Sequence, residues 1–198
     1  PPPHLYDVPK KVMKYVAYSA GVGTPAHVLV RGPADLEGIE RKLNYPLFVK
    51  PAHAGDSRGI DETSLVTDPA RLPLQVAKEL VEFPEVLVEE YIDGREFTVL
   101  VSAGAEGNGH CDVYNPVEYI FPPGPHFKTY AMKTSDLHPS ANIPVRDPAI
   151  VARLTDDAKR VFRMFEGVGY GRMDFRMNAA GELFFLEINF TCSVFYRD

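Results

Sequence analysis

The sequence contains no tryptophan, two cysteines and no long apolar run among its 198 residues. No stretch approaches the roughly 20 consecutive apolar residues that a membrane-spanning helix needs, so we expect no membrane partner. Because the first residues do not combine a basic with an apolar stretch, we also expect no signal peptide. Cys111 and Cys192 could form one bridge, but two reduced thiols in a cytoplasmic protein are the simpler interpretation.

Positive charge is scarce as well, because 21 Lys and Arg residues face 27 Asp and Glu residues. The resulting net charge of -6 argues against nucleic acid as the main partner. A hydrophobic content of 45% and a charged content of 24% are ordinary for a folded globular protein. The length suffices for one domain or two small lobes. Because the sequence opens on Pro1 without a methionine, we expect a fragment of a longer protein.

The chain alternates short helical and β-rich stretches. Apolar spacing and capping residues predict helices over residues 10–20, 33–43, 68–80 and 147–165. β-rich runs predict strands at 27–30, 46–51 and near 111–120. Two hairpins are predicted, over 85–104 around Asp93-Gly94 and over 169–189 around Ala179-Ala180. Because the hairpins are antiparallel and no regular strand–helix–strand alternation is present, we predict the α+β class.

The second hairpin carries a carboxylate and a carboxamide in an otherwise apolar strand. With its turn centred on Ala179-Ala180, Asp174 pairs with Phe185 and Arg172 pairs with Glu187. Side chains alternate across a strand, so two faces follow. The apolar face, which we assign to the core, consists of Met173, Phe175, Met177, Phe184, Leu186 and Ile188. The polar face consists of Arg172, Asp174, Arg176, Glu187 and Asn189.

On this polar face Asp174 and Glu187 are diagonal neighbours, within reach of one shared cation. Two carboxylates and the amide oxygen of Asn189 are hard donors of the kind that Mg²⁺ accepts. The alternative is a solvated sheet face with an Arg172–Glu187 pair across the strands. An error of one residue in the turn would also exchange the two faces.

Two further segments are candidates for ligand binding. The loop over residues 52–59 contains Gly55, Ser57 and Gly59 near Lys50, and its backbone N–H groups could bind a phosphate. An ordinary surface loop is the alternative. The first hairpin would place Glu89, Tyr91, Glu96 and Thr98 on one face, which suits a ribose or a metal but is also typical of an exposed face.

Together these pieces resemble the ATP-grasp superfamily, and within it the D-alanine–D-alanine ligases. The segments that carry the resemblance are "YPLFVKPAHAGDSRGI", "VLVEEYIDGREFTVLV" and "GYGRMDFRMNAAGELFFLEIN". It runs from about Lys10 to Asn189 and implies two α+β lobes whose antiparallel sheets clamp a nucleotide. The smaller lobe would cover about residues 10–92 and the metal-binding lobe about 93–198. The N-terminal lobe of these ligases would be missing from this chain.

The resemblance also implies roles for individual residues. The phosphates of ATP would be bound by Lys10, Lys50, Lys133 and the loop Gly55–Gly59. Adenine would meet the backbone of Glu90 and Ile92, beside Tyr91, and the Glu89 side chain, and Glu96 would bind the ribose. Mg²⁺, with Mn²⁺ as an alternative, would be bound by Asp174, Glu187 and Asn189. The catalytic residues would be Arg172, Lys133 and Ser57.

The implied activity is an ATP-dependent carboxylate–amine ligase that forms an amide bond through an acyl phosphate. The expected partners are ATP and a small amino-bearing substrate, with a homodimer left open. Departures from the ligases occur at Asp56, at Thr134 and in the segment "FTCSV" after Asn189. They argue for a substrate other than D-alanine. The alternative is a nucleotide-binding regulatory domain without ligase activity.

Overall fold

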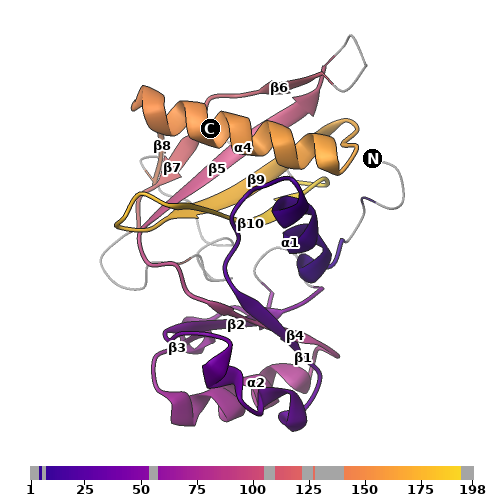
Figure 1. Cartoon of the computed structure of the whole chain (residues 1–198), viewed down its shortest axis with the longest axis vertical. Helices are drawn as coiled ribbons and strands as arrows, with labels where there is room; N and C mark the ends of the chain where they lie inside the picture. The colour runs from indigo at the N-terminus through magenta and orange to yellow at the C-terminus, as the bar shows by residue number, and fades with distance from the viewer. Residues whose placement is uncertain are drawn as a thin grey trace.

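The chain forms two antiparallel sheets, each with its own hydrophobic core (Figure 1). The computed structural model describes residues 5, 8–53, 58–104, 110–121, 127 and 141–192. The helices are α1 (Lys10–Ser19), α2 (Leu72–Leu80) and α4 (Pro148–Met164), with short 3₁₀ turns at Pro33–Leu36, Ile39–Arg41, Glu62–Ser64 and Pro69–Arg71. The strands are β1 (His27–Val30), β2 (Leu47–Pro51), β3 (Leu65–Val66), β4 (Val86–Glu90), β5 (Arg95–Ala103), β6 (Cys111–Val113), β7 (Val117–Tyr119), β8 (Asn142–Pro144), β9 (Tyr170–Met177) and β10 (Leu183–Asn189).

The small sheet has the order β1-β4-β2-β3, and α2 packs on it. Val86, Leu87 and Val88 of the inner strand β4 are all fully buried. The backbone of a strand buried on both faces needs hydrogen-bond partners along both edges, and β1 and β2 supply them for β4. The result is a compact layer at the lower end of the molecule in Figure 1.

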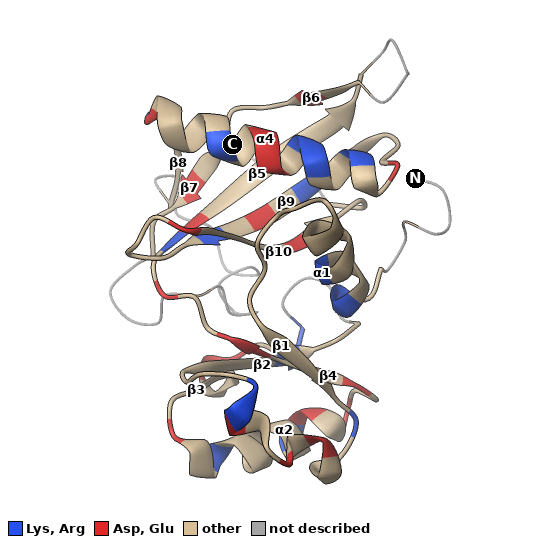
Figure 2. Cartoon of the chain, viewed as in Figure 1, with Lys and Arg blue, Asp and Glu red and all other residues tan. Residues whose placement is uncertain are grey.

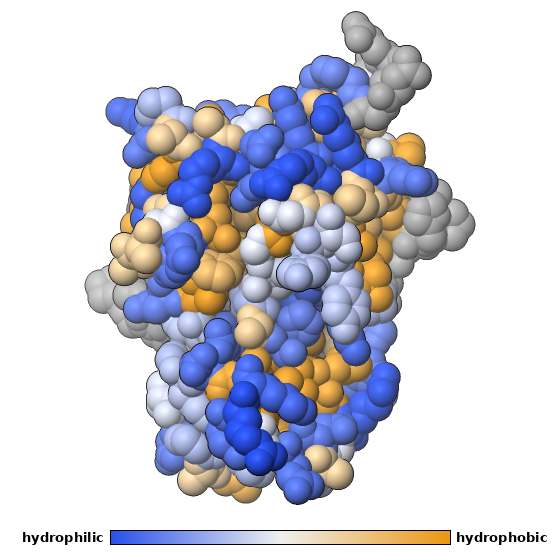
Figure 3. All heavy atoms as spheres, viewed as in Figure 1, coloured by the Kyte–Doolittle hydropathy of each residue, from blue (hydrophilic) through white to orange (hydrophobic). Residues whose placement is uncertain are grey.

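The large sheet has the order β10-β9-β5-β7-β8, with β6 also paired to β5. The predicted helix α4 lies across it and buries Leu154, Ala158 and Val161. Asp147 caps this helix, as expected, by accepting hydrogen bonds from the first-turn N–H groups. The outward face of α4 is mostly hydrophilic (Figure 3).

Helix α1 packs on the large sheet, although it comes before the small sheet in the chain. Met13 and Ala17 are part of the same core as α4 and β10. We expected the smaller lobe to begin near residue 10, but the packing places residues 10–19 with the larger sheet. The sequence could not show this, because an amphipathic helix indicates that it has a buried face without naming the partner of that face.

The predicted first hairpin is wrong. Strand β4 pairs in the small sheet and β5 in the large one, where Thr98 lies opposite Asp174. Asp93-Gly94 is part of a connection between the two sheets. Gly94 has φ 139°, and a Cβ there would lie 2.2 Å from the carbonyl oxygen of Met177, so the close approach of two backbones explains this glycine.

The second hairpin is confirmed, but its register differs from the prediction in two ways: next to the turn it is shifted by one residue, so that Phe185 pairs with Phe175, and a β-bulge follows between Phe185 and Glu187. Glu187 lies directly opposite Asp174, and Asn189 lies opposite Arg172. One extra residue in β10 shifts the alternation of side chains. A shift of one residue at the turn buries Leu183 and Phe185 in place of the predicted Phe184 and Leu186, and the bulge then returns Glu187 to the polar side and Ile188 to the core, as predicted.

Two other predicted elements are interrupted. The expected helix over 33–43 is two short 3₁₀ turns, because Gly38 between them adopts φ +67°. The strand expected near 111–120 is split into β6 and β7 around Asn115-Pro116. Within the described part of the chain, no helix has the length and apolar character to cross a membrane.

Candidate functional site

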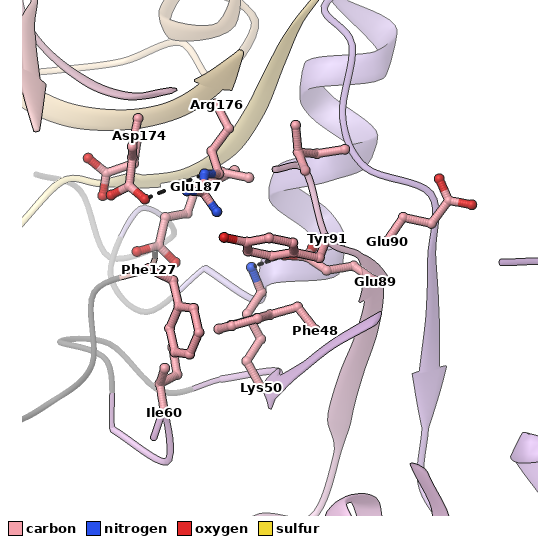
Figure 4. Close-up of a pocket in the computed structure, with 13 residues that line it drawn as sticks. Phe48, Lys50, Ile60, Glu89, Glu90, Tyr91, Phe127, Asp174, Arg176 and Glu187 are labelled. Carbon is pink, nitrogen blue, oxygen red and sulfur yellow. Dashed lines mark hydrogen bonds and ion pairs between the residues drawn. The ribbon is translucent and has the colours of Figure 1, made fainter. Parts of the chain in front are cut away.

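A pocket of about 640 Å³, including space open to solvent, brings together residues of both sheets (Figure 4). Its lining from the small sheet and the following connection consists of Phe48, Lys50, Glu89, Glu90, Tyr91 and Ile92. Its lining from the large sheet consists of Glu96, Asp174, Arg176, Leu186 and Glu187, and Ile60 and Phe127 complete it. A concave site that combines apolar walls with a few convergent polar groups is typical of small-molecule binding.

At the small-sheet side, Glu89 forms a buried ion cluster with two lysines. Its carboxylate lies 2.7 Å from Lys14 Nζ and 2.5 Å from Lys50 Nζ. Burial alone would raise the pKa of Glu89, but the two ammonium groups outweigh it and lower the pKa to about 2. Burial lowers the pKa of Lys14 to about 8, although Glu89 acts in the opposite direction. The cluster therefore has one carboxylate for two ammonium groups.

On the large-sheet side, Asp174 and Glu187 face each other across β9 and β10. Thr98 Oγ1 donates a hydrogen bond of 2.7 Å to Asp174 Oδ1. Lys10 Nζ, at the first residue of α1, lies 3.4 Å from Glu187 Oε2. Figure 2 shows acidic residues on β9 and β10 and basic residues at the end of α1 nearest the small sheet. Charges of both signs thus surround one cavity.

Aromatic rings form one wall of the pocket. Tyr91 lies between Phe48, with ring centroids 6.1 Å apart, and the guanidinium of Arg176, 4.8 Å from the Tyr91 centroid (Figure 4). Phe127 packs edge-on to Phe48 at 5.0 Å. Flat apolar walls beside buried charges suit a ligand that has both a planar ring and charged groups.

A sequence comparison decides the family of this chain. The sequence model described as "D-ala D-ala ligase C-terminus" matches residues 26–193. The chain belongs to the D-Ala–D-Ala ligase C-terminus family. The D-alanine–D-alanine ligase of Bordetella petrii is 33% identical to it over 184 residues, which make up 91% of this chain and 53% of that protein. The chain spans about half the length of the curated relatives that it matches.

Comparison with solved structures shows the fold of this chain. The VanG D-Ala:D-Ser ligase of Enterococcus faecalis gives a TM-score of 0.71 at 23% identity, covering 91% of this chain and 51% of that one. The D-alanine–D-alanine ligase of Bacillus anthracis, complexed with ATP, gives 0.69 at 19% identity, covering 92% and 54%. These similarities confirm the predicted ATP-grasp fold of the α+β class.

Most residues that the family resemblance singled out lie around the pocket. The lining includes Lys50, Glu89, Glu90, Tyr91, Ile92, Glu96, Asp174 and Glu187. A second, adjoining cavity shares Glu187 and is lined by Lys10 and Asn189 as well. Gly55, Ser57 and Lys133 lie outside the described residues, as do Asp56 and Thr134. Their predicted roles stay predictions.

The structure also gives the surroundings of three other predicted residues, which are Glu90, Arg172 and Gly59. The N–H of Glu90 donates to the carbonyl oxygen of Ala26, so this donor is engaged within the fold. The Glu90 carboxylate accepts hydrogen bonds from the backbone and side chain of Asn44, and Figure 4 shows it pointing away from the ring cluster. Arg172 lies on β9 opposite Asn189. Gly59 adopts φ +74°, where a Cβ would lie 2.6 Å from Pro51.

Sequence reasoning missed several side chains of the site. Lys14 lies four residues after Lys10 on α1, on the same helix face, and this spacing was an available signal. Phe48 lies two residues before Lys50 and therefore on the same side of β2. Leu186 and Glu187 are neighbours that both line the pocket, which a regular strand does not allow, and the bulge responsible has no clear signal in the sequence.

The acidic residues fit a divalent cation in donor chemistry. Asp174 and Glu187 supply two adjacent carboxylates. Among the described residues no group of three His, Cys, Asp or Glu side chains could hold a metal ion. Asn189, which lines the adjoining cavity together with Glu187, is the predicted third oxygen donor. Asn189 Oδ1 accepts two hydrogen bonds from Thr191, one from the backbone N–H at 2.8 Å and one from the side-chain hydroxyl at 3.1 Å. The hydroxyl can rotate and leave one lone pair of this oxygen for a cation.

Proposed function

We propose that this chain forms the nucleotide-binding part of an ATP-dependent carboxylate–amine ligase. The observation that carries the proposal is the pocket between the sheets, which combines aromatic walls, the Lys50–Glu89–Lys14 cluster and the Asp174–Glu187 pair. The family, whose curated members include D-alanine–D-alanine ligases, supports the same activity.

The nucleotide would lie with its base against the aromatic wall and its phosphates toward the lysines. Phe48 and Leu186 offer apolar contact to a base, and Glu96 offers a carboxylate to ribose hydroxyl groups. Lys50 lines the same pocket, and Lys10 lines the adjoining one. An ammonium group that contacts a phosphate forms a charge-assisted hydrogen bond, which is among the stronger polar interactions in proteins.

A divalent cation, Mg²⁺ or Mn²⁺, would be held by Asp174, Glu187 and Asn189. When bound, such a cation neutralises phosphate charge during phosphoryl transfer. The chain's own residues orient this site: Thr98 fixes one oxygen of Asp174, and Lys10 lies beside Glu187. In the absence of bound ligands, Lys10 thereby balances part of the acidic charge.

The proposed reaction has two steps, with ATP as a substrate. A carboxylate oxygen of the first substrate attacks the γ-phosphorus, which gives an acyl phosphate and ADP. An amine of the second substrate then attacks the acyl carbon, so that the amide bond forms, inorganic phosphate leaves and the amine loses a proton. Positioning and charge neutralisation contribute most to such a transfer. Lys10, Lys50 and Arg172 are the described residues proposed to supply positive charge.

Nucleotide binding and turnover test the proposal separately. Calorimetry should show that the chain binds ATP with Mg²⁺, and Lys50→Ala should weaken this binding about tenfold or more, since a hydrogen bond to a charged group contributes about 1.5–3 kcal/mol. Lys78→Ala is the matched control, because Lys78 pairs with Asp61 at the exposed surface. Absence of any heat with adenine nucleotides would refute the proposal.

The ligase activity requires a second measurement. ADP release by the protein should depend on the presence of both an acid and an amine, and a panel of D- and L-amino acids would identify the pair. Binding of ATP with no ADP release for any pair would instead favour a nucleotide-binding regulatory domain. Efficient synthesis of D-alanyl-D-alanine would identify the substrate and contradict the expectation of a different amino compound.

A further inference from the structure

Arg176 is a buried arginine in the wall of the main pocket. It is 3% exposed and lies on β9 directly opposite Glu96 of β5. Its Nε lies 3.7 Å from Glu96 Oε2, and its Nη2 donates to the carbonyl oxygen of Gly94 at 3.3 Å. The guanidinium also lies 4.8 Å from the centre of the Tyr91 ring. One side chain thus contacts the pocket carboxylate, the connection between the sheets and the aromatic wall.

The contacts of Arg176 fix two parts of the pocket at once. Tyr91 is held between the guanidinium on one face and Phe48 on the other. Glu96 is paired with this cross-strand neighbour by an ion-pair contact of 3.7 Å, beyond hydrogen-bond distance, and its side chain is 8% exposed. A planar guanidinium with several donors in fixed directions restricts the groups around it more strongly than a flexible ammonium group does.

The charge of Arg176 matters because the pocket is rich in acidic residues. Its described lining contains five acidic residues and two cationic ones, Lys50 and Arg176. Lys50 lies 2.5 Å from Glu89, and Arg176 is a cation beside Glu96 among the residues that the structure describes. Without it, Glu96 would lie among like charges, with more rotational freedom and less compensation of its charge.

We propose that Arg176 is a positioning residue for nucleotide selection, which holds the Glu96 carboxylate toward the hydroxyl groups of a ribose. The inference rests on the proposed binding of ATP in this pocket. A charged carboxylate in one fixed orientation accepts hydroxyl hydrogen bonds well, and a misplaced one does not. Arg176 therefore determines how strongly the site prefers a ribonucleotide over a deoxyribonucleotide.

A role in packing alone makes a different prediction. If Arg176 only stabilised the fold, its replacement would weaken the binding of all adenine nucleotides by the same factor. A positioning role changes the ratio between nucleotides that differ in one hydroxyl group. This ratio is insensitive to the fraction of folded protein, because both ligands meet the same sample.

The experiment measures the affinity of the chain for ATP, 2′-deoxy-ATP and 3′-deoxy-ATP by calorimetry with Mg²⁺. The wild type should bind ATP about tenfold or more tightly than the deoxy analogue whose missing hydroxyl contacts Glu96, as expected for a charge-assisted hydrogen bond. Arg176→Met should reduce this ratio to within about threefold. Arg176→Lys keeps the positive charge and should give an intermediate ratio.

Two further variants complete the design. Glu96→Gln should remove the preference by itself, and adding Arg176→Met to it should change the ratio little, because both act on one contact. Arg95→Met is the matched control: Arg95 is an arginine of β5 that pairs with Glu118 outside the pocket lining. It should keep the wild-type ratio.

The outcomes separate this inference from the proposed function. A folded Arg176→Met variant with the wild-type ratio overturns the inference while ATP binding stands. If that variant does not fold, Arg176→Gln, which keeps a donor for the Gly94 carbonyl, decides by the same ratio. A wild-type chain that binds ATP without any preference also overturns the inference. A wild-type chain that binds no nucleotide overturns the proposed function, and the inference with it.

Discussion

The two members of the buried Lys14–Glu89 pair should respond very differently to replacement. Lys14 is fully buried, and Glu89 is 3% exposed. Two ammonium groups share the one carboxylate. Removing Lys14 as Lys14→Met leaves a balanced Lys50–Glu89 pair, whereas Glu89→Gln leaves two buried like charges. The stability of the chain should therefore depend much more on Glu89.

The two pKa shifts set the expected changes in the free energy of unfolding. The fall of the Glu89 pKa from 4.5 to about 2 corresponds to about 3 kcal/mol in favour of its ionised form. The fall of the Lys14 pKa from 10.5 to about 8 corresponds to about 3 kcal/mol against its ammonium form. The Lys14 pKa already includes the attraction of Glu89, so Lys14→Met removes a net cost and should leave the stability unchanged or raise it by at most about 3 kcal/mol. Glu89→Gln should destabilise by about 3–5 kcal/mol.

Urea unfolding at pH 7 measures both free energies. Because the chain has no tryptophan, the signal is far-UV circular dichroism or tyrosine fluorescence. Lys78→Met is the control, since the Lys78–Asp61 pair is half-exposed and should contribute less than about 1 kcal/mol. If Lys14→Met destabilises the chain as much as Glu89→Gln does, the two-to-one charge balance of the cluster is not what stabilises it.

Three other perturbations have expected outcomes. Between pH 8 and 10.5 the unfolded chain binds the Lys14 proton more tightly than the folded chain, so wild-type stability should rise with pH there, and a Lys14→Met chain measured in parallel should lack this component. As the pH falls from about 4.5 to 2, the contribution of Glu89 should be lost, which an acid titration of stability would detect as a step that Glu89→Gln lacks. Gly94→Ala should lower the melting temperature strongly, because its Cβ would lie 2.2 Å from a backbone oxygen at φ 139°; a melting temperature equal to that of Gly181→Ala, where the space is open, would contradict the steric reason.

The sequence predicted best those elements whose signals are local. Helix α4 has its cap at Asp147 and a proline at its first position, and the structure has both. The β9–β10 hairpin was found from its turn and its apolar residues. Glu187 lies opposite Asp174 and lines a cavity with Asn189, because the bulge compensates for the one-residue shift at the turn, which alone would have moved Glu187 and Asn189 to the core side.

Features that depend on distant partners were not predictable in the same way. Asp93-Gly94 has the residues of a tight hairpin turn, but the two flanking strands find other neighbours in separate sheets. Lysine is usually a surface residue, and the burial of Lys14 is explained only by the approach of Glu89 on β4. Such pairings are set by the tertiary fold, which short-range patterns do not encode.

The bulge in β10 has a consequence for length variation in this strand. In a regular strand, neighbouring side chains cannot both face one cavity. The irregularity between Phe185 and Glu187 lets Leu186 and Glu187 do so, while Phe185 and Ile188 remain in the core. Deleting Leu186 would therefore restore the simple alternation of side chains along β10. Glu187 would still face the pocket, and Phe185 and Ile188 would still face the core. An apolar pocket wall can in this way be added to or taken from the strand independently of the residues proposed to bind metal.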